Sequence, residues 1–159
     1  MQLYIKQKVF SIGDRFSVYD ADGYEKYHVE GEIFTFGKRF HIYDLSGNEL
    51  FYIEEKIFTF LPKFYIFREG QQVAEIIKEF TFFNNEYTVN GPGWSVTGNF
   101  LDHDYDVKDR NGMIIASVAK EWLSWGDTYS INISDAVDEA FALAVVIVID
   151  ACLEKQKNN

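Results

Sequence analysis

The most restrictive feature of the sequence is an unbroken apolar run near its C-terminus, Ala140–Ile149, which is bounded by Glu139 and Asp150. A helix that is apolar on every side must be buried all round, in a protein core or in a bilayer. A bilayer span needs about 20 apolar residues, and this run has half that length. The sequence therefore predicts a buried central helix over about 135–154 and no transmembrane segment. A buried strand is the alternative, because residues 145–149 are β-branched, but the length and alanine content favour a helix.

An internal repeat precedes this run. Each unit contains an aromatic position, a short strand of alternating polarity, a turn with glycine beside Asp, Asn or Ser, and a second strand. Alternating β-branched and aromatic residues are typical of strands, and these turn residues adopt left-handed backbone angles at little cost. The aromatic positions are 20 to 24 residues apart and are Phe10, Phe34, Phe58, Phe80, Phe100 and Trp122.

Six units with two strands each predict an antiparallel meander of twelve strands within a single domain over 1–159. The strands are expected at residues 4–9, 15–20, 25–33, 39–44, 49–57, 63–68, 72–79, 86–90, 94–101, 104–109, 113–120 and 127–133. Residues 156–159 are expected to form a disordered tail.

The repeat and the apolar run explain each other. Side chains fill a barrel of eight strands, whereas twelve strands enclose a wider space that something else must occupy. The predicted fold is therefore all-β with one helix: a closed twelve-stranded antiparallel β-barrel of six hairpin repeats around a buried C-terminal hydrophobic helix. An ordinary two-sheet sandwich is the alternative.

Composition excludes several classes of function. Lysine and arginine total 15 against 25 aspartates and glutamates, a net charge of −10, and no stretch is basic enough for a nucleic-acid partner. A single cysteine, Cys152, excludes a disulfide framework, and its apolar neighbours favour an inert buried thiol. No signal peptide is visible, so a cytoplasmic location is expected.

One long segment resembles the LURP-one-related family, especially its short bacterial members. The similarity is carried by residues 94–107, continues through Asp109-Arg110-Asn111-Gly112 and Lys120-Glu121-Trp122, and includes the helix ending Ile149-Asp150-Ala151. The resemblance implies a fold similar to tubby C-terminal domains and phospholipid scramblases, which is a twelve-stranded barrel around a central helix. Tubby-type domains bind phosphoinositides through clustered lysines and arginines. No matching cluster is found here, so no lipid-binding residue is carried over.

Two groups of charged residues are candidate sites. Asp102, Asp104 and Asp106 alternate and would share one face of a strand, where three carboxylates could bind Ca²⁺ or Mg²⁺. The densest basic set, which could contact an anionic ligand, is Lys38, Arg39, Lys63 and Arg68. In both cases a solvated surface is the alternative interpretation.

Asp150 directly follows the apolar run, and we expect it to reach water where the helix leaves the barrel. A buried carboxylate paired with a basic residue is the alternative. The three histidines, His28, His41 and His103, lie in different strands and form no catalytic arrangement.

The sequence contains no recognisable catalytic motif, and no cofactor is expected. The favoured interpretation is a non-enzymatic cytoplasmic binding or scaffold module with an unknown protein partner. The first alternative is a peripheral domain that binds membrane phospholipid or phosphoinositide. The second is an enzyme that uses the acidic face around Asp102–Asp106.

Overall fold

The computed structural model describes residues 1–6, 15–32, 36–81, 85–123 and 126–157. The strands are β1 (Gln2–Ile5), β2 (Arg15–Asp20), β3 (Glu25–Gly31), β4 (Arg39–Tyr43), β5 (Glu49–Glu55), β6 (Lys63–Arg68), β7 (Gln71–Glu79), β8 (Glu86–Asn90), β9 (Trp94–Asn99), β10 (Asp104–Lys108), β11 (Ile114–Leu123) and β12 (Gly126–Ile133). A 3₁₀ turn, η1 (Phe100–Asp102), lies between β9 and β10, and the chain continues into α1 (Glu139–Lys157).

The sheet closes into a barrel, which confirms the predicted fold class. Each strand pairs antiparallel with its neighbours in sequence, and β1 completes the ring by pairing with β12. Leu3, for example, lies opposite Ile131 on one side and Asp20 on the other. Closure gives each of the twelve described strands a neighbour on both sides, which removes a common route to aggregation.

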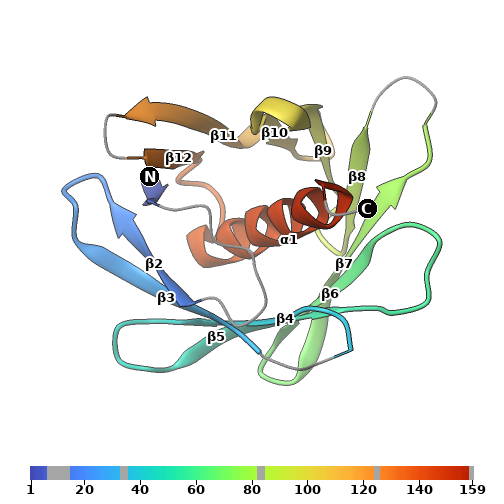
Figure 1. The fold of residues 1–159 in the computed structure, drawn as a ribbon, viewed down its shortest axis with the longest axis horizontal. Helices are drawn as coiled ribbons and strands as arrows, with labels where there is room; N and C mark the ends of the chain where they lie inside the picture. Colours follow the sequence, from blue (N-terminus) through green and yellow to red (C-terminus); the bar gives the residue numbers. More distant parts are fainter. Residues whose placement is uncertain (7–14, 33–35, 82–84, 124–125, 158–159) are drawn as a thin grey trace.

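The helix α1 occupies the interior of the barrel (Figure 1). Its residues Leu143–Ile149 are at most 1% exposed, because the alternating strands direct apolar side chains such as Phe64 and Ile66 toward the helix. Phe141 extends from the helix to the rings of Phe51 and Trp94, with ring centroids 5.8 and 5.0 Å apart. The predicted buried central helix is therefore confirmed. No helix of the described chain is both long and apolar enough to cross a bilayer.

Successive connections lie at opposite ends of the barrel, because neighbouring strands are antiparallel. We call the end formed by residues 36–38, 56–62, 80–81 and 100–103 the loop end, and the opposite one the turn end. Three tight connections at the turn end share one design, in which an aspartate accepts hydrogen bonds from the backbone two and four residues later. Their aspartates are Asp20, Asp44 and Asp109. Each turn ends on a glycine with a φ of 80 to 86° (Gly23, Gly47 and Gly112).

The helix differs from the expected range of 135–154 at both ends. It begins at Glu139, because the Asp138 carboxylate accepts a 3.2 Å hydrogen bond from the Phe141 N–H and caps the first turn. It continues to Lys157, so Gln156 and Lys157 are helical where a disordered tail was expected, and residues 158–159 lie outside the described residues.

The strand boundaries agree with the expected ones to within a few residues. The largest described difference is in β11, which continues to Leu123 where an end at 120 was expected, because its ladder with β12 runs on to that residue. Residues 7–9 and 33 of the expected strands lie outside the described residues, as do the repeat positions Phe10 and Phe34 and the side chain of Trp122.

Candidate functional site

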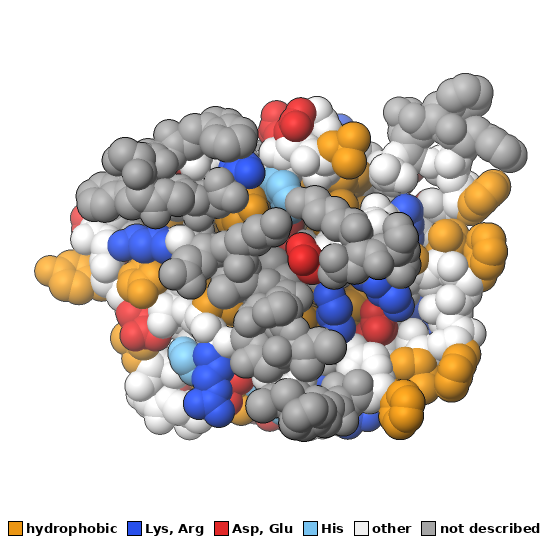
Figure 2. All heavy atoms as spheres, in the orientation of Figure 1, with side chains coloured by type: hydrophobic (Ala, Val, Ile, Leu, Met, Phe, Trp, Pro, Cys, Tyr) orange, Lys and Arg blue, Asp and Glu red, His pale blue; other side chains and the backbone are white. Residues whose placement is uncertain are grey.

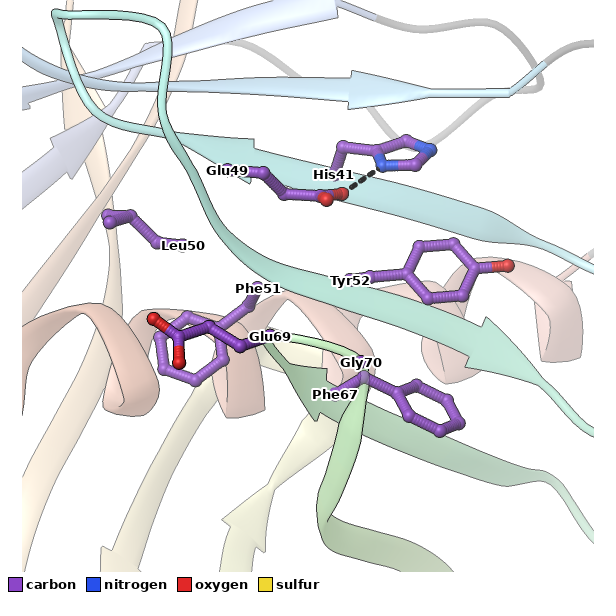
Figure 3. Close-up of a pocket in the computed structure, with 8 residues that line it drawn as sticks. All are labelled: His41, Glu49, Leu50, Phe51, Tyr52, Phe67, Glu69 and Gly70. Atoms are coloured by element: carbon purple, nitrogen blue, oxygen red, sulfur yellow. Dashed lines mark hydrogen bonds and ion pairs between the residues drawn. The ribbon is translucent and has the colours of Figure 1, made fainter.

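A groove on the outer face of the barrel is the strongest candidate for a binding site. It lies between β4, β5 and the β6–β7 turn and has a volume of about 420 Å³. Its lining residues, drawn in Figure 3, are His41, Glu49, Leu50, Phe51, Tyr52, Phe67, Glu69 and Gly70. Because α1 fills the interior, this outer wall is where a ligand can make extensive contact.

Three rings from three adjacent strands form the aromatic part of the groove. The register places His41 opposite Tyr52 and Tyr52 opposite Phe67. The ring centroids of the first pair are 5.0 Å apart and those of the second are 5.7 Å apart. The alternation of each strand directs these rings outward while their neighbours enter the core, which explains why aromatic side chains line the outer surface here.

Carboxylates surround these rings. His41 Nδ1 contacts Glu49, and its Nε2 lies 3.6 Å from a carboxylate oxygen of Glu32. The phenol of Tyr52 donates a 3.3 Å hydrogen bond to Glu54. Partial burial, together with the charge of Glu54, raises the pKa of Tyr52 to about 12. An aromatic surface flanked by carboxylates attracts cations.

A second polar group is buried inside the barrel near the loop end. Asp150 is only 2% exposed, so the expectation that it reaches water is wrong. The helix continues past it, which keeps its carboxylate within the barrel. Tyr105 donates a 3.0 Å hydrogen bond to Asp150 Oδ1, and His103 Nδ1 lies 3.7 Å from the same oxygen. Burial, and then the nearby Asp150, raises the pKa of Tyr105 well above its ordinary value.

The three aspartates predicted as a candidate metal site lie in two different elements. Asp102 belongs to η1 and accepts a hydrogen bond from the Asn99 side chain, whereas Asp104 and Asp106 lie on β10. Asp106 also accepts a 2.6 Å hydrogen bond from Ser117 Oγ. Within the described parts of the chain, no three His, Cys, Asp or Glu side chains are grouped as metal ligands.

The four predicted basic residues do not come together. Lys63 and Arg68 begin and end β6, so they lie at opposite ends of the barrel. Lys63 pairs with Glu75 at 3.2 Å, and Arg68 pairs with Asp138 and lies 4.6 Å from the Phe51 ring. These two side chains therefore have structural roles, and binding of an anionic ligand by the set stays a prediction.

The other two basic residues, Lys38 and Arg39, lie together at the loop end. Lys38 donates a 3.3 Å hydrogen bond to the Ala151 carbonyl in the C-terminal half of α1. Burial lowers the pKa of Lys38.

Cys152 is buried beside this end of the helix, as expected for an inert thiol. Burial raises its pKa from 9.0 to about 12, so the nucleophilic thiolate is strongly disfavoured.

Sequence reasoning missed the aromatic groove, although its signal was present. Polar and aromatic residues alternate in β4, β5 and β6, but only the register shows that His41, Tyr52 and Phe67 share one outer surface.

Comparison with known proteins supports the fold. A family model described as LURP-one-related matches residues 1–150. The chain belongs to the LURP-one-related family. It is 35% identical over 153 residues to the uncharacterized protein YxjI of Bacillus subtilis, covering 96% of this chain and 94% of that protein. It is also 40% identical over 63 residues to protein LURP-one-related 6 of Arabidopsis thaliana, covering 38% of this chain and 32% of that protein.

A solved structure shows the same architecture. The X-ray structure of a protein from Arabidopsis thaliana superposes with a TM-score of 0.69 at 17% identity, covering 94% of this chain and 88% of that one. The names of these relatives state no reaction or ligand. Membership of the LURP-one-related family therefore establishes the fold, and function rests on the geometry of the described surfaces.

Proposed function

We propose that this LURP-one-related protein is a non-enzymatic binding module whose partner contacts the outer wall of the barrel. The observation that carries the proposal is the burial of α1: Leu143–Ile149 fill the space that other wide barrels use for a ligand. A ligand is therefore confined to the outside or to the two ends.

The chemistry of the outer groove favours a cationic partner. Tyr52 and Phe67 contribute rings to the groove, and Glu49 and Glu69 contribute carboxylates to its lining. A lysine or arginine side chain placed over such a ring gains both cation–π and ionic attraction. The overall charge of −10 also attracts basic segments. We propose that the partner is a basic segment of another protein.

Two observations support the absence of catalysis in this proposal. The thiol of Cys152 is buried and its pKa is raised, which withholds it from nucleophilic attack. His41, the histidine of the groove, has a carboxylate beside each ring nitrogen, those of Glu49 and Glu32.

Titration with peptides tests the proposal. A lysine- and arginine-rich peptide should bind at low salt by calorimetry, and an acidic peptide of equal length should not. Tyr52→Ala should weaken binding about two- to fivefold, which is the magnitude of an exposed cation–π contact.

The control variant is Tyr4→Ala, because Tyr4 lies on β1, on another part of the wall. This variant should bind the basic peptide like the unmodified protein. Equal binding of the basic and acidic peptides, or equal loss in both variants, would overturn the proposal.

A further inference from the structure

Four phenylalanine side chains extend into solvent at the loop end. Phe58 and Phe60 in the β5–β6 connection are 97% and 92% exposed, Phe36 in the β3–β4 connection is 86% exposed, and Phe80 after β7 is 64% exposed. Figure 2 shows hydrophobic side chains gathered along the right side of the molecule, where Figure 1 draws the β5–β6 and β7–β8 connections. Burying a phenylalanine is strongly favourable, so four rings that keep most of their surface in solvent make this end of the barrel unusually apolar. We call this set the phenylalanine rim.

The connections that carry the rim lie against one another. A Cβ atom added to Gly37 would come within 2.8 Å of Ile57 Cγ2, so the β3–β4 and β5–β6 connections touch. The backbone N–H of Lys78 donates a 3.2 Å hydrogen bond to the Pro62 carbonyl, which joins the β5–β6 connection to the end of β7. The phenylalanines therefore belong to one continuous surface.

The backbone at Phe58 is strained. Its φ is +59°, a conformation that is uncommon for residues other than glycine and rare for bulky ones. The side chain gains nothing from burial in return, since it is almost completely exposed. Strain of this kind persists mainly where it serves function, and here it projects a ring into solvent.

Lysines lie beside the phenylalanines of the rim. Lys56 comes two residues before Phe58 and Lys78 two residues before Phe80. Lys38, two residues after Phe36, is instead directed to the Ala151 carbonyl of α1. Within the described chain, neither Lys56 nor Lys78 makes an ion pair. The turn end is more acidic. Its connections carry Arg110 against six acidic residues, which are Asp22, Asp44, Glu69, Asp109, Asp135 and Asp138, whereas the described loop-end connections carry Lys6, Lys38 and Lys56 against Glu32 and Asp102. The charge distribution therefore directs the rim, and not the turn end, toward a negative surface.

We propose that the phenylalanine rim is a membrane-contact surface that enters the interface of an anionic phospholipid bilayer. Rings on separate connections can each enter the boundary between headgroups and acyl chains, while Lys56 and Lys78 contact lipid phosphates. This alternation of rings and lysines matches a bilayer interface better than a protein interface, whose core is depleted of charged residues. The proposal is independent of the outer groove, which lies beside the β6–β7 turn at the other end of the barrel.

Co-sedimentation with vesicles tests the inference. The protein should bind phosphatidylcholine vesicles that contain phosphatidylserine, bind vesicles of phosphatidylcholine alone less well, and bind more weakly as salt rises. Phe58→Ser and Phe60→Ser should each lower the apparent partition coefficient about tenfold.

The matched control is Leu45→Ser, which removes an exposed apolar side chain at the turn end. It should leave vesicle binding unchanged, and the melting temperature of all three variants should show that they remain folded. Absence of binding to the phosphatidylserine vesicles at low salt would overturn the inference, as would equal loss in the control. Concentration-dependent self-association that the rim variants abolish, without vesicle binding, would also overturn it and would assign the rim to contact between copies of this chain. Peptide binding by the groove is measured separately, so failure of one proposal leaves the other intact.

Discussion

The phenol of Tyr105, on strand β10, donates a 3.0 Å hydrogen bond to the carboxylate of Asp150 in the middle of the C-terminal half of α1. This bond joins the wall of the barrel to its central helix at a fully buried position. Apolar packing is non-directional and would tolerate several rotations or shifts of the helix. A hydrogen bond between two fixed groups selects one rotation and one position of the helix.

Tyr105→Phe should therefore destabilise the protein although it removes only one oxygen atom. Loss of the donor deprives a buried carboxylate of a hydrogen bond, which costs about 1–3 kcal/mol of unfolding free energy. Urea titration at neutral pH measures the change. Tyr4→Phe, on the outer wall, should stay within about 0.5 kcal/mol of the unmodified protein. Similar free energies for both variants would contradict a structural role for the bond.

Alkaline pH should lower the unfolding free energy, and Cys152 should contribute to this loss from about pH 9. Above pH 9 the thiol ionises in the unfolded chain, whereas burial keeps it protonated in the folded protein up to about pH 12. The unfolded state therefore binds fewer protons, and Cys152 costs about 1.4 kcal/mol of unfolding free energy per pH unit in that window. The raised pKa of Tyr105 also lowers the unfolding free energy as the pH rises above about 10.

The variant Cys152→Ala isolates this contribution. It should be less stable than the unmodified protein at pH 8 because it leaves a cavity, but its stability should fall less steeply between pH 9 and 10. Lys38, which interacts electrostatically with Cys152, acts in the opposite direction, because burial lowers its pKa. Parallel pH profiles from denaturant unfolding would exclude the thiol as a source of the alkaline loss.

Phe58→Gly should separate stability from membrane contact. Glycine adopts a φ of +59° without the 1–2 kcal/mol penalty of other residues but loses about 0.4–1 kcal/mol to the freedom of the unfolded chain. We expect a net gain of about 0.5–1 kcal/mol, seen as a higher melting temperature, together with weaker vesicle binding. A variant that is destabilised and binds vesicles normally would show that the ring supports the fold.

Asp138→Ala should fray the start of α1. The carboxylate caps the Phe141 N–H and pairs with Arg68, so its removal should cost about 1–2 kcal/mol of unfolding free energy. Asp135→Ala is the matched control, because Asp135 precedes the helix and is 90% exposed. Amide hydrogen exchange at Phe141 and Ala142 should accelerate only in the first variant. Unchanged exchange would indicate that barrel packing, and not the cap, determines where the helix begins.

The fold could be predicted because its two signals are local in the sequence. The alternation of apolar and polar residues and the glycine turns between them indicated the strands. The apolar run is too short for a bilayer, so it had to be buried inside the protein. The position of Asp150 could not be predicted, since its burial depends on how far α1 continues past it, and that end of the helix is joined to the wall by an ion pair between Lys155 and Glu55. This pair joins residues 100 positions apart, and the pair between Arg68 and Asp138 at the start of the helix joins residues 70 positions apart.

The outer surfaces were harder to predict for a related reason. The spacing of Phe58 and Phe80 defines the repeat, but spacing does not distinguish a ring in the core from one at the tip of a connection, and Phe100 at the equivalent position is buried. The groove around Tyr52 requires the register of three strands, which the sequence of any one strand does not contain.

The location of α1 after all twelve strands has a consequence for biosynthesis. A ribosome releases the wall of the barrel before it releases the helix that the wall must surround. The strand β1 also stays without one of its partners until β12 has been synthesised. The nascent sheet therefore exposes its apolar inner face and two unpaired edges until residues 139–157 emerge. In a cell, this interval is when the chain depends most on chaperones, and a premature stop before α1 would leave the exposed state as the final product.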